Sequence, residues 1–192
     1  MAGKSEEKRE LILAKAEQVF IRKGFNGVTM KDIIEECEIS RGGIYLYYSS
    51  VDEIFTEVIK RHNQSNAEKI IIDIENSSFE VLLDKYFEIQ KSRLLHMENS
   101  LLLAMFEFFI VHKQEPDKDF FSGAFDILEN TLIEILNCGV KEGYIREDNA
   151  RVVAANILFC IKGLETLAMS NGVSDKLVDT QFEFYKKMFF HE

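Results

Sequence analysis

The residues best suited to chemistry stand between positions 29 and 50, and the chemistry they suit is contact with phosphate groups. Thr29, Ser40 and Ser50 each precede a short apolar pattern and are typical helix N-caps. Helix amino termini present N–H groups and a positive partial charge, which attract phosphate. After the second cap the chain reads Arg41-Gly42-Gly43-Ile44-Tyr45. This segment combines a cation and a phenol with two glycines that leave room for close approach.

Elsewhere the sequence lacks the groupings that catalysis or metal binding requires. The four histidines show no metal-ligand spacing, and the three cysteines are far apart and form no CxxC pair. There is no phosphate-binding glycine loop and no apparent pair of nucleophile and base. We therefore expect no enzyme activity, no cofactor and no metal.

Helices must position these residues. Only one proline, Pro116, interrupts the chain, and apolar residues recur at helical spacing almost throughout. Caps and breaks predict an all-α fold of about nine helices, and no period-two pattern indicates a strand. The predicted helices span 6–23, 30–37, 41–47, 51–75, 79–97, 99–113, 118–143, 148–171 and 175–190. The pair at 30–37 and 41–47, with a three-residue turn between them, has the spacing of a helix-turn-helix.

Charge and length divide the chain into two parts. We assign residues 1–50 to a helix-turn-helix domain and residues 51–192 to a larger domain, with a connecting helix at 51–75. The net charge of −10 belongs to the second part, because residues 1–50 contain eight basic and eight acidic residues. Acidic bulk does not exclude a locally positive face. We expect no membrane-spanning segment and no signal peptide, and hence a cytoplasmic protein.

Residues 9–55 resemble the amino-terminal domain of the TetR family of bacterial regulators. The resemblance rests on Gly24-Phe25, Val28-Thr29, Ser40 to Tyr45, Tyr47-Tyr48 and Asp52 to Phe55. It implies a ligand-responsive transcriptional regulator that binds a palindromic double-stranded DNA operator as a homodimer. Because most members of this family are repressors, we expect a repressor. The DNA contacts would come from Thr29, Lys31, Ser40, Arg41, Gly42, Gly43, Tyr45, Tyr47 and Ser50. The resemblance places Tyr48 in the core instead.

Two positions depart from the family pattern. The family commonly has glycine in the turn, where this chain has Glu38, and a left-handed conformation costs a non-glycine residue roughly 1–2 kcal/mol. The family also commonly has a phosphate-contacting lysine where this chain has Val51. One missing ionic contact predicts a shallower dependence of DNA affinity on salt, by about one unit of slope.

The later helices are expected to form an effector pocket and a dimer interface. The resemblance implies that the phenylalanine-rich middle helices enclose a small apolar or cationic effector. For this pocket we select Phe87, Gln90, Leu94, Phe106, Glu107, Phe121 and Phe125. Glu107 is the only charge between Leu101 and Val111, and it favours a cation if it points inward or is simply exposed if it does not.

Two apolar stripes at helical spacing are the candidates for the dimer interface. One stripe consists of Val153, Ile157, Cys160, Leu164 and Leu167, and the other includes Val178, Phe182 and Phe189. Two helices from each subunit would form a four-helix bundle, although the same stripes also suit the core of one subunit. A different function remains open as well: the acidic charge and Val51 also suit a protein-interaction module whose helix-turn-helix no longer binds DNA.

Overall fold

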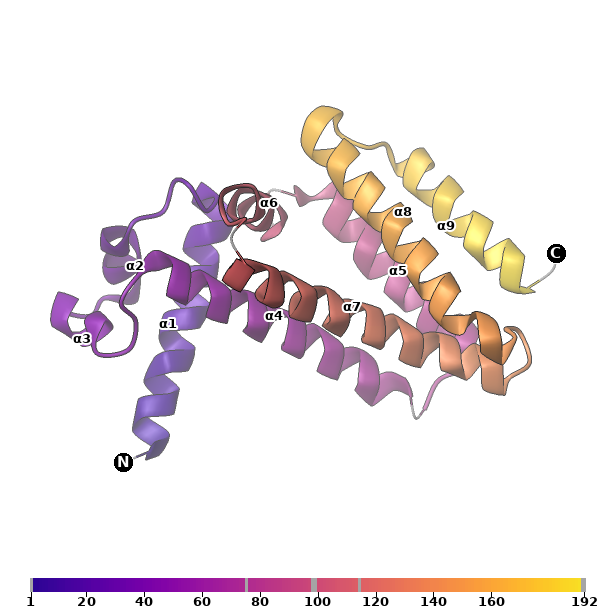
Figure 1. Ribbon diagram of the computed structural model, residues 1–192, viewed down its shortest axis with the longest axis horizontal. Helices are drawn as coiled ribbons and strands as arrows, with labels where there is room; N and C mark the ends of the chain where they lie inside the picture. The colour runs from indigo at the N-terminus through magenta and orange to yellow at the C-terminus, as the bar shows by residue number, and fades with distance from the viewer. Residues whose placement is uncertain (1, 75, 98–99, 114, 191–192) are drawn as a thin grey trace. The chain divides into compact units, whose positions relative to one another are not determined.

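The protein is a set of packed helices, which confirms the expected all-α class (Figure 1). The computed structural model describes the backbone of residues 2–74, 76–97, 100–113 and 115–190, and the side chains of 5–65, 74, 76–97, 100–113 and 127–190. The described α-helices are α1 (Ala2–Lys23), α2 (Met30–Cys37), α3 (Arg41–Tyr45), α4 (Val51–Ile74), α5 (Phe79–Leu95), α6 (Leu102–Val111), α7 (Glu115–Lys141), α8 (Ala150–Asn171) and α9 (Asp175–Phe190). A 3₁₀ turn, η2 (Glu147–Asn149), precedes α8.

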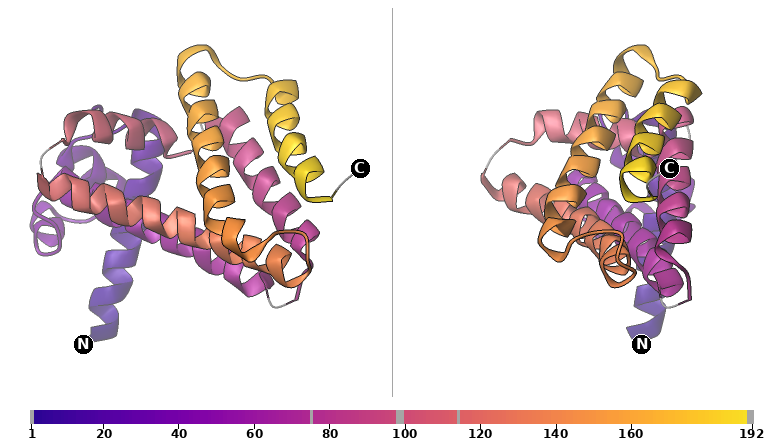
Figure 2. Two further views of the ribbon diagram at one scale, coloured as in Figure 1. Left: turned by 45° about the vertical axis from the view of Figure 1, so that its right-hand side comes forward. Right: turned by 90° about the vertical axis from the view of Figure 1, so that its right-hand side faces the viewer.

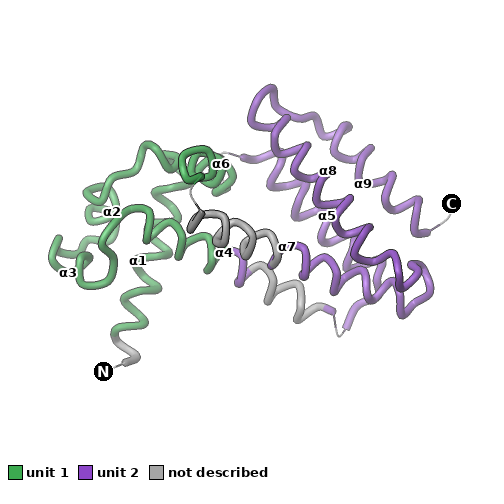
Figure 3. Tube along the Cα trace, in the orientation of Figure 1, with its two compact units in different colours: residues 1–62, 98–119 green, residues 63–97, 120–192 purple. Residues whose placement is uncertain are grey.

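The helices form two compact units, and the division between them does not fall after residue 50. Unit 1 comprises residues 1–62 and 98–119, and unit 2 comprises residues 63–97 and 120–192 (Figure 3). The first part of α4 and the whole of α6 thus belong to the unit that contains the helix-turn-helix. The reason is aromatic packing, because Phe55 of α4 and Phe108 of α6 have ring centroids 5.1 Å apart within the core of unit 1.

Unit 1 is held together by the apolar stripe of α1 and the buried sides of α2, α3 and α4. Ile12, Ala16 and Phe20 of α1 are fully buried, as are Ile33 of α2 and Ile44 of α3. The rings of Phe20 and Phe55 lie 4.5 Å apart. Full burial of a phenylalanine contributes about 1.5–3 kcal/mol, so this cluster is the main support of the two short helices α2 and α3, which are too small to be stable alone.

Unit 2 consists of α5, α8 and α9 lying side by side, together with the carboxyl-terminal part of α7 (Figure 2). Phe87 of α5 and Phe182 of α9 stack with their ring centroids 4.5 Å apart. Ile157 and Ile161 of α8 are buried in the same core. Lys91 ties α5 to α9 through ion pairs with Asp175 at 3.1 Å and Asp179 at 2.5 Å.

Most helix bounds agree with the sequence patterns to within a few residues; α1 begins at Ala2 and not at 6, and two of the other differences have local causes. α7 begins at Glu115 and not at 118, because Pro116 falls in the first turn, where its missing N–H has no helical partner to lose. α3 ends at Tyr45 and not at 47, since Leu46 and Tyr47 form a turn instead.

One helix meets the length and composition of a membrane span, contrary to the expectation that none would. Among the described residues, the segment Glu147–Asn171 has a mean hydropathy of 1.6 over its most apolar window. One side of this helix packs in the core of unit 2, where Ile157, Leu158 and Ile161 are buried, and 33% of the window is buried in all. The helix also carries a buried carboxylate, Glu165, which pairs with Arg93 and Lys162.

Candidate nucleic-acid interface

The helix-turn-helix is built from local capping bonds. Thr29 Oγ1 accepts a hydrogen bond from the Asp32 amide at 3.3 Å, and the Asp32 carboxylate accepts from the Thr29 amide at 2.8 Å. This reciprocal pair is the expected capping box and fixes the first turn of α2. Hydrogen bonds from Lys23 and Thr29 lower the pKa of the Asp32 carboxyl to about 2. Ser40 begins α3 in the same way, with its Oγ accepting from the Gly43 amide at 3.1 Å.

The turn between α2 and α3 contains a strained residue. Glu38 has φ 55° and ψ 33°, which is left-handed, and its amide donates to the Glu35 carbonyl at 3.3 Å. Among the described non-glycine residues it alone has a positive φ. The turn therefore keeps the left-handed geometry for which glycine is suited, and the glutamate bears the conformational cost.

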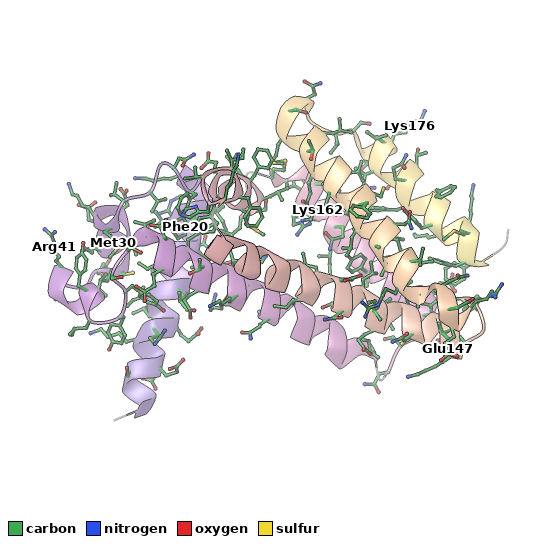
Figure 4. The ribbon with its side chains drawn as sticks, in the orientation of Figure 1. Phe20, Met30, Arg41, Glu147, Lys162 and Lys176 are labelled. Atoms are coloured by element: carbon green, nitrogen blue, oxygen red, sulfur yellow. The ribbon has the colours of Figure 1, made fainter. Side chains whose placement is uncertain are left out.

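The two faces of α3 are sharply different. Ile44 and Tyr48 are buried against unit 1, while Arg41, Gly42 and Tyr45 are exposed. Arg41 projects away from the other helices of unit 1 (Figure 4), and its guanidinium carbon lies 5.6 Å from the centre of the Tyr45 ring. The structure thus keeps the predicted contacts Arg41 and Tyr45 together on one accessible surface.

The two glycines of α3 have different roles. A Cβ on Gly42 would meet no atom within 4 Å, so this glycine opens the outer face of the helix to an approaching surface. A Cβ on Gly43 would lie 3.1 Å from Ser40 Oγ, so this glycine makes room for the capping hydroxyl. Gly42 therefore suits contact with a ligand, whereas Gly43 supports the local fold.

Leu46 is an exposed residue that the sequence analysis did not select. Its side chain is 83% exposed, the highest value among the large apolar side chains that the structure describes. It directly follows α3, and helical spacing from the buried Ile44 and Tyr48 was the signal that could have placed it on the outer side. An apolar side chain here has the chemistry to contact a thymine methyl group in a major groove.

The remaining predicted contacts are partly engaged within unit 1. Lys31 is exposed and lies 3.7 Å from Glu35 on the same helix. Tyr47 is half-buried, and Ser50 Oγ accepts from the Glu53 amide at 3.1 Å. Arg41 forms no ion pair with any carboxylate among the described side chains, so its charge is directed outward.

Two basic residues of α1 are occupied by α2. Lys23 Nζ lies 2.6 Å from Asp32 Oδ1, and Arg22 pairs with Glu36. Near the amino end of α1, Arg9 stacks over the ring of Tyr48 at 5.4 Å, and Tyr48 is buried as expected. Positive charge on the outer surface of the helix-turn-helix therefore depends strongly on Arg41.

Residues 12–58 match the sequence model described as bacterial regulatory proteins, tetR family. The matched range begins in α1, contains the whole helix-turn-helix and ends in α4. This part of the chain, which holds the helix-turn-helix, is therefore that of the tetR family.

Several relatives of this chain are regulators by name. YfiR, an HTH-type transcriptional regulator of Bacillus subtilis, is 30% identical over 133 residues, which cover 69% of this chain and 65% of YfiR. The repressor BepR of Brucella suis is 40% identical over 55 residues, 29% of this chain and 26% of BepR. The alignments thus span less than two thirds of each relative.

Solved structures share the fold over nearly the whole chain. Reduced NemR of Escherichia coli superposes with a TM-score of 0.79 at 15% identity, covering 97% of this chain and 100% of NemR. FadR of Bacillus subtilis in complex with stearoyl-CoA superposes with a TM-score of 0.73 at 19% identity, covering 95% and 98%. At these identities the likeness establishes the fold of this chain and not its ligand.

The residues predicted to form the effector pocket are divided between the two units. Phe106 and Glu107 lie in unit 1, and Glu107 accepts a hydrogen bond from the Asn26 amide at 2.9 Å. The Glu107 carboxylate is thus engaged by the backbone within unit 1. Phe87, Gln90 and Leu94 are buried in unit 2, and the side chains of Phe121 and Phe125 lie outside the described residues.

Gln90 is the distinctive polar residue in the core of unit 2. It is 8% exposed, and its Oε1 atom has no hydrogen-bond donor among the described residues. The same unit has a surface cleft of about 230 Å³, whose lining is mostly charged. It consists of Glu80, Asp84, Glu183, Lys186, Lys187 and Phe190. Gln90 is not part of that cleft.

Most residues predicted for the dimer interface belong to the core of one subunit, which corrects the assignment. Burial inside the single chain removes Ile157, Leu164, Val178, Phe182 and Phe189 from contact with a partner. Val153 and Cys160 pack against that core, and Leu167 is 45% exposed. The cause is that α8 and α9 each carry apolar residues on two faces. The predicted stripes lie mostly on the buried face, and the second apolar face is exposed.

The exposed face of α8 and α9 has helical spacing of its own. Val152 and Phe159 of α8 are 61% and 69% exposed, and Phe184 and Met188 of α9 are 64% and 42% exposed. Gly163, one turn beyond Phe159, has open space where a Cβ would stand. This surface presents apolar side chains outward, whereas among the residues of the predicted stripes Leu167 is the exposed one.

Proposed function

We propose that this chain is a ligand-responsive transcriptional regulator, most simply a repressor, that binds operator DNA as a homodimer. The observation that carries the proposal is the two-sided segment formed by α3 and the turn after it. Ile44 and Tyr48 are anchored in the core, and Arg41, Gly42 and Tyr45 are turned outward. Arginine bonds the edge of guanine, and a tyrosine hydroxyl donates to phosphate, which sets the register of the helix on the duplex.

A homodimer is required for two copies of α3 to read one palindrome. The copies must stand about 34 Å apart, one turn of the duplex. The exposed row on α8 and α9, which includes Val152, Phe159, Phe184 and Met188, suits a symmetric four-helix contact between two subunits. Gly163 on the same face allows the helices to approach closely.

An apolar effector in unit 2 is part of the proposal. Gln90 lies about one helical turn after the buried Tyr86 and Phe87 on α5, and its uncompensated buried oxygen is costly unless a donor reaches it. A mostly apolar molecule that carries one hydrogen-bond donor has that chemistry. The structural neighbour FadR, which holds stearoyl-CoA, supports an apolar ligand for this fold. Glu107 no longer argues for a cation, because it is bonded in unit 1.

Selection of duplexes from a random pool tests the DNA-binding part. The recovered duplex should bind wild-type protein, and the double variant Arg41→Ala, Tyr45→Phe should lose at least about a hundredfold in affinity, since each bidentate arginine contact contributes about 1–3 kcal/mol and occurs twice. Arg146→Ala is the matched control, because it removes the same charge from an exposed residue of unit 2. Sequence-specific binding that survives the double variant would refute the site.

The same experiment decides between this proposal and a protein-interaction module. Pairing of Arg22 and Lys23 with α2 carboxylates leaves few outward cations and is the observation that favours the module. Failure of wild-type protein to enrich any duplex at low salt would favour that alternative.

An effector is sought by thermal shift, because a true ligand stabilises the folded state by mass action. Gln90→Leu should remove the shift, whereas Gln64→Leu, at an exposed position, should keep it.

A further inference from the structure

Two buried polar atoms on α5 lack the hydrogen-bond partners that buried groups ordinarily have. Gln90 is 8% exposed, and its Oε1 atom accepts no hydrogen bond from the described residues. The side chain of Arg93 is 26% exposed, but its Nε–H is enclosed and donates to none of the described residues either. An unpaired buried donor or acceptor is costly, so both atoms offer a bond to a further molecule.

The two atoms belong to neighbouring positions on one side of α5. Residues three apart on a helix have Cβ atoms about 5–6 Å apart, and a hydrogen bond spans about 2.9 Å. A single small chemical group can therefore bond to Gln90 and Arg93 at once. Gln90 Oε1 requires a donor and the Nε–H of Arg93 requires an acceptor, so this group must both donate and accept.

The buried row of α5 around Gln90 is otherwise apolar or aromatic. Phe87 precedes Gln90 and Leu94 follows it, each about one helical turn away, and both are 2% exposed. Tyr86 is buried on the same row, and this burial raises the pKa of its phenol above the ordinary value. A molecule that bonds to Gln90 from within the core therefore needs an apolar body.

The charge of Arg93 is already matched within unit 2. Its Nη2 atom pairs with Glu165 of α8, the helix that lies beside α5 (Figure 2). Glu165 is 4% exposed, and its other oxygen accepts from Lys162 Nζ at 2.8 Å. The side chain of Lys162 is 37% exposed, so water solvates its charge. The unpaired atoms of Gln90 and Arg93 thus offer hydrogen bonds without an unmatched charge.

We propose that Gln90 and Arg93 form a subsite for an uncharged carboxamide head group on an apolar effector. The amide N–H donates to Gln90 Oε1, and the amide oxygen accepts from the Nε–H of Arg93. A carboxylate would set its charge against the carbonyl oxygen of Gln90, and an ammonium group would face the guanidinium of Arg93, so both are disfavoured. This inference rests on the proposed function, whose effector it narrows to a neutral class of molecule.

Four probes with one alkyl tail and different head groups test the subsite on the full-length protein. They are octanamide, 1-octanol, octanoate and octylamine. Gln90→Met removes the acceptor at nearly constant side-chain size, and Arg93→Lys keeps a cation beside Glu165 but removes the Nε–H. Arg151→Lys, at an exposed position of α8, is the matched control. The measurements are Kd and the shift in Tm without DNA, so they do not depend on operator binding.

Octanamide should bind at least about tenfold more tightly than octanoate or octylamine, with 1-octanol between them, because only the amide satisfies both atoms with separate groups. Gln90→Met and Arg93→Lys should each remove most of that preference, and Arg151→Lys should keep it. Without a probe, Gln90→Met should unfold at the wild-type temperature or above it, since an unpaired polar atom is removed.

Three results would overturn the subsite. One is tighter binding of a charged probe than of octanamide. Another is the absence of octanamide binding, as expected if buried water alone satisfies both atoms. The third is a marked fall in the Tm of probe-free Gln90→Met, which would make Gln90 a structural residue. Failure to select any DNA duplex would instead refute the proposed regulator and leave the head-group preference intact, so the two proposals fail separately.

Discussion

Replacement of Glu38 by glycine should stabilise this protein. The residue has φ 55° and its side chain is exposed, so the backbone strain is not repaid by packing. A left-handed conformation costs an L-residue about 1–2 kcal/mol. Glycine avoids that cost, but its greater backbone freedom stabilises the unfolded state by about 0.4–1 kcal/mol, which offsets part of the gain. The net gain is about 0.5–1 kcal/mol, which corresponds to an increase in Tm of about 1–4 °C for a chain of this length.

Thermal unfolding of Glu38→Gly beside Glu38→Ala separates strain from charge. Both variants remove the same carboxylate, but alanine keeps a Cβ and therefore keeps the left-handed strain. We expect glycine to raise Tm and alanine to leave it unchanged or lower it. If alanine raised Tm as much as glycine, the carboxylate and not the backbone would be the source of the effect. Both variants should gain the same small amount of DNA affinity, since each removes one negative charge from the turn.

Three further predictions concern affinity, pH and assembly. Val51→Lys should steepen the dependence of log affinity on log salt by about 0.9 per subunit, or about 1.8 per dimer. Titration of the selected duplex between low and moderate salt measures the slope. An unchanged slope would show that position 51 does not reach a phosphate. The pKa of Asp32 is lowered to about 2 in the folded state, so its stabilising effect is complete above about pH 4 and is lost as pH falls towards 2. The difference in unfolding free energy between wild type and Asp32→Asn should shrink over that range, and a constant difference would exclude the capping carboxylate as its cause. Phe159→Ser should raise the dissociation constant of a homodimer by about a hundredfold, because the dimer would otherwise bury two phenyl rings that are exposed in the single chain. Sedimentation at decreasing protein concentration measures this constant. Val178→Ala, in the subunit core, should lower Tm without changing the dissociation constant.

The sequence alone determined the local structure of the helix-turn-helix. Capping bonds connect residues three apart, so Thr29 with Asp32 and Ser40 with Gly43 could be identified without tertiary information. The buried side of α3 followed from helical spacing for the same reason, and Tyr48 was correctly placed in the core. Helix positions were predictable to within a few residues, because the caps and apolar periods are properties of neighbouring residues.

Only the tertiary structure decided which distant segments meet. The apolar neighbours of Glu107 in the sequence predict either a pocket carboxylate or an exposed side chain, but its partner is the backbone amide of Asn26, 81 residues away. The periodicity of α8 showed apolar stripes without showing which one is buried, since a helix with two apolar faces satisfies both patterns. Packing against α5 and α9 buries Ile157 and leaves Phe159 exposed. Local patterns specify elements and their caps, whereas the choice among apolar faces depends on contacts that form only when the chain is folded.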